Sequence, residues 1–319
     1  MPARSPSLSK GLRRVDADGN PVAFRTFNKR GFHEKAPVSR CRGRSARGSP
    51  PLCAQQTPVE PPDHCAAFLP YGEPAYTAPH PEVTALLVNL APGAKVLLCR
   101  QAYVLLSDTA AKVSAWEAYT LTKEHAIGCT LRSNAFAADL TLPKGSRSTP
   151  ADYAKNGYDI GHMAPDGDMS WDDGVERESF ILTNMSPQLA GLNRGLWKLL
   201  ESNVRAWAYE RGDTLLVYVG PVYDTKTDKK IGAGQVDVPQ GFFKIVVDTK
   251  TGEVLAFLFP QASDLGTDLT TVRVREAEVE KETGIHFPLP AGAREPAALW
   301  PVSLGQFTKA KSAACKESK

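Results

Sequence analysis

Two side chains between residues 158 and 201 are suited to acid–base and metal chemistry. His162 ends a short extended segment, Tyr158–His162, and histidine titrates nearest neutral pH, so it can accept a proton from water in the working range. Asn193 offers a neutral amide oxygen, and Mg²⁺ takes oxygen ligands while it keeps most of its own waters. Residue types of this kind can serve one base and one hard cation.

The segments after the candidate base predict the elements that position it. Residues 180–183 form a short apolar run that predicts a buried strand, and residues 192–211 carry apolar side chains at intervals of three and four, which predicts an amphipathic helix. Asn193, Trp197 and Glu201 are four apart and lie along one face of that helix. Because a helix N-terminus favours phosphate, this strand–strand–helix unit can hold one hard cation and one base around a phosphodiester.

The wider pattern predicts a mixed α+β domain over residues 63–305, with a central antiparallel sheet and helices beside it. Short turns join most of the expected strands, and residues 248–252 predict a hairpin turn. The expected strands are 95–100, 103–106, 116–122, 214–220, 242–248 and 254–259, and a late helix is expected over 274–283. Residues 306–319 are expected to form a polar tail.

Charge is distributed unevenly along the chain. The net charge is +3, but residues 1–52 contain twelve Lys or Arg and three acidic residues, so they carry +9 and leave −6 for the remainder. The basic total is therefore no evidence for nucleic-acid binding, and any phosphate-binding surface must be local. No run approaches the roughly 20 apolar residues that a membrane-spanning helix needs, so no membrane partner is expected.

Residues 1–62 are rich in Arg, Ser, Pro and Gly and lack apolar periodicity, which predicts a disordered basic extension. Two alternatives stay open: a segment similar to a transit peptide, and a misassigned start upstream of about Leu52. The segment lacks the apolar stretch of a secretory signal.

Six cysteines are enough for disulfides, and the absence of a CxxC pair argues against a thiolate zinc site. We expect a disulfide, mostly for Cys65 with Cys99, and hence a periplasmic or secreted protein. Reduced buried thiols are the alternative.

Three segments carry a resemblance to a known family: Asp159–His162 (Asp-Ile-Gly-His), Asn184–Gln188 (Asn-Met-Ser-Pro-Gln) and Leu192–Glu201. In order and spacing they resemble the DNA/RNA non-specific endonuclease family, the ββα-metal group that includes mitochondrial endonuclease G and secreted bacterial sugar-non-specific nucleases. Further similar segments are Arg132–Phe136, Val238–Lys244 and Val279–Gly284, so the resemblance spans about Cys65 to Pro290.

The resemblance implies a ββα-metal nuclease fold and a Mg²⁺-dependent endonuclease that cuts DNA and RNA without sequence preference, leaving 5′-phosphate ends. It implies that His162 is the general base and that Asn193 is the direct protein ligand of one Mg²⁺, for which Mn²⁺ can substitute. The supporting residues are Glu201, which reaches the ion through water, Asp159 and Asn184, which orient their neighbours, and Arg132 and Arg194, which clamp phosphate oxygens. A homodimer and a protein inhibitor stay open as partners.

One residue departs from the family pattern. The family's usual arginine between Asp and Gly is Ile160 here. Loss of a charge-assisted hydrogen bond to phosphate is worth about 1.5–3 kcal/mol, or about one to two powers of ten in rate or affinity. We therefore expect a slower enzyme rather than an inactive one.

Simpler roles compete with each assignment. His162 could be a packing histidine, Asn193 a helix cap, and Glu201, Arg132 and Arg194 solvated surface charges. The acids at 166–173 suggest a calcium loop, but they lack the ligand alternation of an EF-hand. At the level of function, the alternatives are an attenuated relative that binds nucleic acid or a protein, supported by Ile160, and a phosphodiesterase for small nucleotides, which usually needs a multi-carboxylate metal cluster.

Overall fold

The computed structural model describes residues 14–15, 21–22, 63–77, 83–84, 93–223 and 229–317. Contacts divide the chain into two units, Met1–Val59 and Glu60–Lys319. The first unit contains strands β1 (Arg14–Val15) and β2 (Pro21–Val22), which pair antiparallel. The rest of the expected basic extension, residues 1–62, lies outside the described residues.

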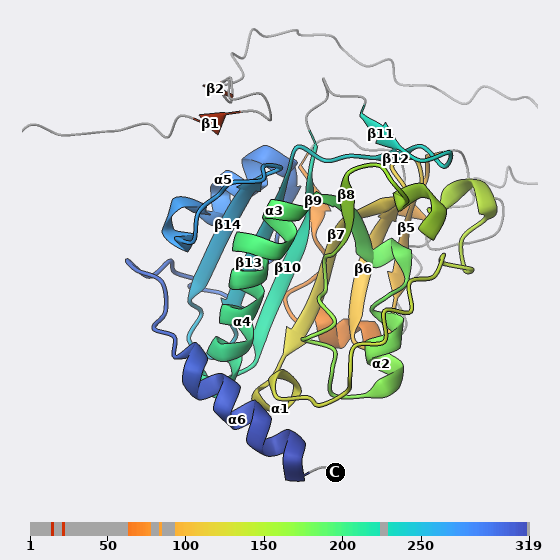
Figure 1. Cartoon of the computed structure of the whole chain (residues 1–319). Coiled ribbons are helices and arrows are strands. Elements are labelled where there is room, and N and C mark those ends of the chain that lie inside the picture. Colours follow the sequence, from red (N-terminus) through yellow and green to blue (C-terminus); the bar gives the residue numbers. More distant parts are fainter. Residues whose placement is uncertain are drawn as a thin grey trace, which may run out of the picture. The chain divides into compact units, whose positions relative to one another are not determined.

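The second unit is built on an eight-stranded sheet with the order β15-β14-β13-β10-β7-β6-β5-β4 (Figure 1). All neighbouring strands run antiparallel except β4 and β5. The strands are β4 (Val83–Thr84), β5 (Lys95–Cys99), β6 (Tyr103–Asp108), β7 (Val113–Leu121), β10 (Leu215–Val222), β13 (Gly241–Asp248), β14 (Val254–Pro260) and β15 (Arg273–Val274). The expected α+β class with a central antiparallel sheet is confirmed.

Alternation along the strands supplies two apolar cores, one on each face of the sheet. In β10, Val217 and Val219 enter one core, whereas Leu216 and Tyr218 enter the other. This is the period of two that strand geometry imposes. Helix α4 packs on the first face and helix α5 on the second.

The remaining elements surround these faces. The α-helices are α1 (Lys123–Ala126), α2 (Asp173–Glu178), α3 (Ala190–Leu192), α4 (Lys198–Arg211), α5 (Glu276–Thr283) and α6 (Leu304–Glu317), and a π-helical turn, η5 (Asn193–Trp197), joins α3 to α4. The short 3₁₀ turns are η1 (Asp63–Phe68), η2 (Lys144–Ser146), η3 (Pro150–Tyr153), η4 (Leu182–Asn184) and η6 (Leu269–Thr271). Three small strand pairs are β3 (Ala75–Tyr76) with β16 (Ile285–His286), β11 (Lys230–Ile231) with β12 (Val236–Asp237), and β8 (Tyr158–His162) with β9 (Met185–Leu189). Among these described elements, no helix is long and apolar enough to cross a membrane.

Strands β8 and β9 and the α3–η5–α4 helix form the expected strand–strand–helix unit (Figure 1). The predicted strand over 180–183 is wrong in position. Residues 182–184 form the 3₁₀ turn η4, closed by the Asn184 N–H donating to Ile181 O at 2.9 Å, and the strand begins at Met185. The residues of this run are apolar because they are buried at the turn. Their burial therefore did not require an extended strand.

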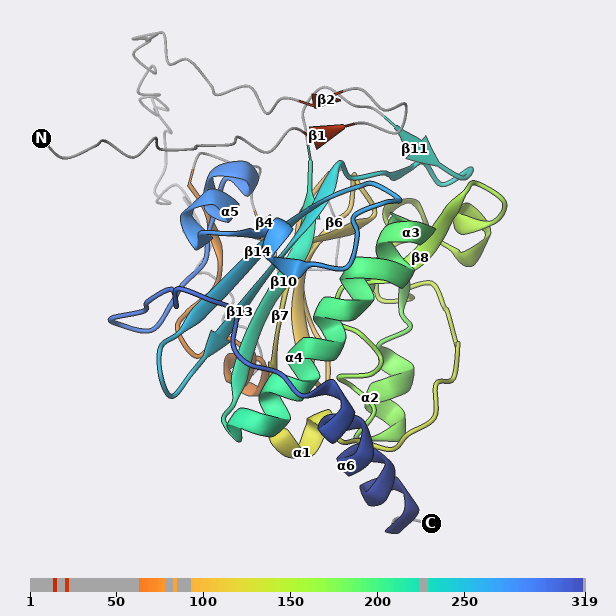
Figure 2. The same cartoon turned by 60° about the vertical axis from the view of Figure 1, so that its left-hand side comes forward.

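The predicted polar tail over 306–319 is also different in the structure, because Leu304–Glu317 form helix α6. Phe307 enters the core beneath it, and Cys315 forms a disulfide with Cys129. Figure 2 shows α6 crossing the lower end of α4 beside α1. The expected Cys65–Cys99 disulfide is confirmed; Cys41 and Cys53 lie outside the described residues.

Candidate active site

The β8–β9 pair sets the geometry of the site. Its antiparallel register places Asp159 opposite Gln188, Gly161 opposite Ser186 and His162 opposite Met185. A Cβ atom at Gly161 would lie 2.0 Å from Gln188 Oε1, so the fully buried Gln188 side chain occupies the space that any larger residue would need. Glycine beside the histidine is therefore a packing requirement of this hairpin.

His162 lies at the end of β8 in an aromatic pocket. Its ring is 4.8 Å from the ring of Phe180, edge to face, and 5.9 Å from that of Phe136. The residue is buried, and its Nε2 has no hydrogen-bond partner among the described residues. Burial, assisted by the charge of Arg132 and opposed by that of Asp166, lowers the pKa of His162 to about 3. The imidazole is thus neutral near pH 7, but with this pKa it is a weaker base than the near-neutral histidine that the sequence predicted.

Asn193 is tied to the same hairpin through Asp159. Its Nδ2 donates to Asp159 Oδ2 at 2.9 Å, while Arg194 donates to both oxygens of that carboxylate, at 2.8 Å from Nε and 2.6 Å from Nη2. Burial alone would raise the pKa of Asp159, but the hydrogen bonds from Arg194 and Asn193 outweigh it, and the pKa is lowered. Asn193 is not the helix cap of the simpler interpretation, because it lies within the helix at φ −56° and ψ −45°.

Glu201 lies two turns further along the helix and is half-buried. Burial raises its pKa to about 7 against the charges of Lys244 and Arg205, and Asp166 adds to the rise. The charge of Asp166 acts on both His162 and Glu201.

A charged row on the sheet lies beneath this helix. Lys244 on β13 and Glu117 on β7 both pair with Val219 on β10, so they flank it in register. Both are fully buried, and Lys244 Nζ lies 4.7 Å from the centroid of the Trp197 ring with no hydrogen-bond partner among the described residues. Burial raises the pKa of Glu117 to about 8 and lowers that of Lys244, which the Glu201 charge opposes.

Arg205 completes the helix face below Glu201. Its Nη1 donates to the buried Asp168 at 2.7 Å, and Asp168 also accepts from the Tyr119 hydroxyl at 2.8 Å. The charges of Asp168 and Glu201 raise the pKa of Arg205 against the opposing effect of burial, which is the largest contribution. The guanidinium of Arg205 therefore stays charged near Glu201.

Arg132 is held beside the histidine pocket. Its Nε donates to Asn134 Oδ1 at 2.8 Å, its Nη1 pairs with Asp166, and its guanidinium carbon lies 4.8 Å from the centroid of the Phe180 ring. Asn134 adopts φ 53°, a left-handed conformation that asparagine tolerates better than most residues. Arg132 is close enough to lower the pKa of His162, and its side chain is 43% exposed, so incoming phosphate can reach it.

Asn184 has a different position from the other predicted site residues. It is fully buried, its Oδ1 accepts from the Ala164 N–H at 2.8 Å, and its Nδ2 donates to Ala164 O at 2.8 Å and Ser179 O at 2.7 Å. These bonds leave it no free donor for substrate. Asn184 therefore fixes the loop that follows His162.

The acids at 166–173 are committed to other contacts and do not form a calcium loop. Asp166 pairs with Arg132 and Asp168 with Arg205. Asp172 caps α2 by accepting from two backbone N–H groups, and Asp173 accepts from the Thr130 hydroxyl. Among the described residues, no group of three or more His, Cys, Asp or Glu is placed to hold a metal.

The residues present fit a singly anchored, hydrated Mg²⁺. Because Asn193 uses its Nδ2 for Asp159, its amide oxygen is left as an acceptor, and no hydrogen bond to that oxygen is found in the described part of the chain. The Glu201 carboxylate likewise has no direct hydrogen-bond donor there. One amide oxygen and one nearby carboxylate match an ion that retains most of its waters.

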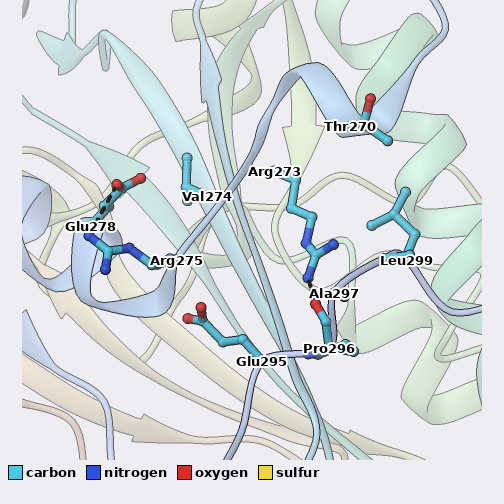
Figure 3. Close-up of a pocket in the computed structure, with 10 residues that line it drawn as sticks. Thr270, Arg273, Val274, Arg275, Glu278, Glu295, Pro296, Ala297 and Leu299 are labelled. Atoms are coloured by element: carbon cyan, nitrogen blue, oxygen red, sulfur yellow. Dashed lines mark hydrogen bonds and ion pairs between the residues drawn. The ribbon is translucent and has the colours of Figure 1, made fainter. Parts of the chain in front are cut away.

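A separate cavity of about 610 Å³ lies elsewhere (Figure 3). Arg273, Arg275, Glu278 and Glu295 contribute to its lining, but none of the predicted site residues does. Arg273 donates a hydrogen bond to Pro296 O, and Arg275 forms an ion pair with Glu278. This cavity is therefore distinct from the candidate active site.

The residues that sequence reasoning missed are Arg205, Asp168, Lys244 and Glu117. Arg205 had a local signal, since it follows Glu201 by four positions on the same helix face. Lys244 stood in a segment already noted for its resemblance, but nothing local showed that it lies under the helix. Asp168 and Glu117 had no such signal.

Comparisons with known proteins show the family to which the chain belongs. The chain matches the DNA/RNA non-specific endonuclease family over residues 83–291. It is 34% identical to Nuclease C1 of Cunninghamella echinulata var. echinulata over 61% of this chain and 84% of that protein, and 31% identical to a nuclease of Serratia marcescens over 60% and 74%. It is 30% identical to mitochondrial endonuclease G of Bos taurus over 61% and 70%.

A solved structure supports the same conclusion. EndoG in the EndoG/EndoGI complex matches with a TM-score of 0.60 and 26% identity, over 72% of this chain and 93% of that one. This likeness bears out the expected ββα-metal fold. The chain therefore belongs to the DNA/RNA non-specific endonuclease family and is a nuclease.

Proposed function

We propose that this protein is a Mg²⁺-dependent endonuclease that hydrolyses DNA and RNA without sequence preference and leaves 5′-phosphate ends. The observation that carries the proposal is the neutral His162 ring, whose Nε2 has no partner in the described part of the chain, beside the exposed Arg132. Asn193 is meanwhile anchored through its nitrogen, which leaves its oxygen for a cation.

In this mechanism His162 acts on water at the scissile phosphate. The ring accepts a proton from a water molecule as its oxygen forms a bond to phosphorus. The bond from phosphorus to the 3′ oxygen breaks, and that oxygen leaves with a proton drawn from solvent. The product ends are a 5′-phosphate and a 3′-hydroxyl, so atoms and charges balance.

Asn193 and Glu201 would hold Mg²⁺, Asn193 through its amide oxygen and Glu201 through water. When bound, the ion neutralises charge on the phosphate and on the departing oxygen. Mn²⁺ would serve in the same position. Asp159 keeps the Asn193 amide turned to present its oxygen, and Asn184 keeps the loop after His162 in place.

The guanidinium groups would bind backbone phosphates. Arg132 has a half-exposed fork next to His162, and Arg194 extends from Asp159 with a side chain that is 73% exposed. Contacts of this kind carry no sequence information. They account for a nuclease that accepts both polymers.

The test is cleavage of plasmid DNA and of RNA by the purified chain, with Mg²⁺ or EDTA. His162→Ala should reduce the rate by about 10²- to 10⁴-fold. His286→Ala is the matched control, because that histidine is exposed and pairs with Glu280 away from the site. Full activity of His162→Ala, or activity that survives EDTA, would refute the mechanism.

The second candidate is an attenuated relative that binds nucleic acid or a protein partner. Ile160 favours it, since it stands where the family has arginine. A folded wild-type chain that binds but cuts neither polymer would make this the better account. The EndoG/EndoGI complex shows that a similar nuclease has a protein inhibitor, and an inhibitor of this chain, like a homodimer, is a proposal. The two disulfides support a periplasmic or secreted location.

A further inference from the structure

An aromatic pair lies beside the candidate active site and has no part in the proposed hydrolysis. The rings of His125 and Trp171 stack with centroids 4.2 Å apart and planes 10° from parallel. Trp171 is 36% exposed, and no second ring contacts it among the described residues. The other four tryptophans are buried, with at most 4% exposure. A partly exposed indole that is already held flat by a stacked ring offers a base a rigid aromatic surface.

The backbone connects this pair to the phosphate-binding residue Arg132. The Thr130 N–H donates to Ser170 O at 2.8 Å, and the Thr130 hydroxyl donates to Asp173 at 2.8 Å. Trp171 follows Ser170 directly, and Arg132 follows Thr130 by two residues, which span at most about 7 Å. The segment that carries Trp171 therefore runs beside the segment that carries Arg132.

A cation contacts the residue that precedes Trp171. Lys311, on helix α6, donates from Nζ to Ser170 Oγ at 3.2 Å. Helix α6 lies beyond residues 83–291, the part that matches the family, and the Cys129–Cys315 disulfide fastens it to the segment that leads to Arg132. An ammonium group that contacts the loop of Trp171 could bind a phosphate of a strand whose base stacks on Trp171.

We propose that His125, Trp171 and Lys311 form a stacking platform for a single-stranded stretch of DNA or RNA, on which a nucleobase lies against the exposed face of Trp171. The proposal rests on the proposed nuclease function and adds a preference to it. Bases of a single strand are free to stack on the indole, whereas bases of a duplex are already stacked on one another. Every base has a flat face, so the platform is compatible with cleavage without sequence preference.

Tryptophan fluorescence tests the platform directly, because Trp171 is the exposed tryptophan of the chain. The full chain carrying His162→Ala, which binds without cutting, is titrated with an oligothymidine of about eight nucleotides. We expect quenching that saturates with binding. An abasic strand of equal length should bind through its phosphates without quenching. Binding itself is followed independently by anisotropy of a labelled strand.

Variants separate stacking from folding. Trp171→Ala should weaken oligothymidine binding by about 5- to 100-fold, while Trp171→Phe should stay within about threefold and abolish the fluorescence response. Leu131→Ala is the matched control, since Leu131 is a neighbouring apolar side chain that is 82% exposed, and it should bind as the parent does. In the active chain, Trp171→Ala should slow cleavage of single strands more than that of duplexes.

The outcomes distinguish the platform from the nuclease function. If Trp171→Ala binds oligothymidine like its parent and no quenching occurs, while the wild-type chain still cuts plasmid and RNA, the platform is wrong and the nuclease assignment stands. If Trp171→Ala melts at a lower temperature and Trp171→Phe also loses binding, the ring is structural and the platform is likewise overturned. If the wild-type chain neither binds nor cuts any strand, both proposals fail.

Discussion

Asp159 and Asn193, which are 34 positions apart in the chain, are joined by a hydrogen bond of 2.9 Å from the Asn193 amide nitrogen to the Asp159 carboxylate. The bond decides which end of the amide remains for a cation, because the nitrogen is occupied and the oxygen is not. The aspartate of the Asp-Ile-Gly-His segment thus contacts Asn193, the proposed metal ligand, and has no hydrogen bond to His162 in the described part of the chain.

Asp159→Ala should therefore weaken Mg²⁺ binding more than it weakens substrate binding. Without its anchor the Asn193 amide can rotate, and we expect the Mg²⁺ concentration for half-maximal cleavage to rise by about 10- to 100-fold. Arg194→Ala is the control, because it removes the other partner of Asp159 and leaves the Asn193 bond. An equal rise in both variants would show that the ion pair, not the amide anchor, matters.

Lys244→Met should shift the acidic limb of the pH–rate profile to higher pH. The Lys244 charge lowers the pKa of Glu201, which burial raises to about 7. Removal of that charge leaves more Glu201 protonated near neutrality and should slow cleavage there, with recovery in alkaline buffer. Lys244→Arg keeps the positive charge, so the acidic limb of its pH–rate profile should stay closer to the wild-type pH. A uniform loss of rate at every pH in Lys244→Met would contradict this role.

His162 should make the protein less stable in acid. Its folded-state pKa of about 3 lies below the ordinary 6.5, so the unfolded chain binds a proton that the folded chain does not as pH falls through 6.5. Between pH 7 and pH 5 this contributes a loss of about 2 kcal/mol in the free energy of unfolding. Urea titrations at both pH values should show that His162→Gln lacks this part of the loss; an identical loss in both proteins would rule it out.

Ile160→Arg should raise activity and lower stability. Ile160 is half-buried against an apolar cluster that includes Ile231 and Val236, so an arginine there loses packing, at a cost of about 1–2 kcal/mol. A new contact to phosphate should raise kcat/KM by about 10- to 100-fold. Ile160→Gln gives up the packing without adding charge, and it should not gain activity. A rate for Ile160→Arg no higher than that of Ile160→Gln would mean that position 160 does not face substrate.

Cys315→Ala should release helix α6. The Cys129–Cys315 disulfide closes a separation of 186 residues, and loss of such a link typically costs about 2–5 kcal/mol. The melting temperature should fall in oxidising buffer, and a reductant should have a smaller further effect on the variant than on the wild-type chain. Equal melting temperatures of the two proteins in oxidising buffer would show that the packing of Phe307 alone holds the helix.

The sequence was sufficient for features that depend on neighbours within one element. Apolar residues at intervals of three and four predicted the helix that became α4, and short apolar runs between turns predicted most strands of the sheet. The π turn over Asn193–Trp197, which interrupts the expected continuous helix, was not predicted. The types and order of the site residues could likewise be identified from the sequence, through its resemblance to a known family. The covalent chain dictates these relationships, so they need no knowledge of the fold.

The tertiary structure decided which groups surround those residues. The register of β7, β10 and β13 places Lys244 and Glu117 on either side of Val219, and the packing of α6 brings Lys311 to Ser170. The bond that orients Asn193 goes to Asp159 on strand β8, and Phe136 and Phe180 contribute to the burial that keeps His162 neutral. Contacts and desolvation between elements depend on how the elements pack against one another. The spacing of residues within one segment does not determine that packing.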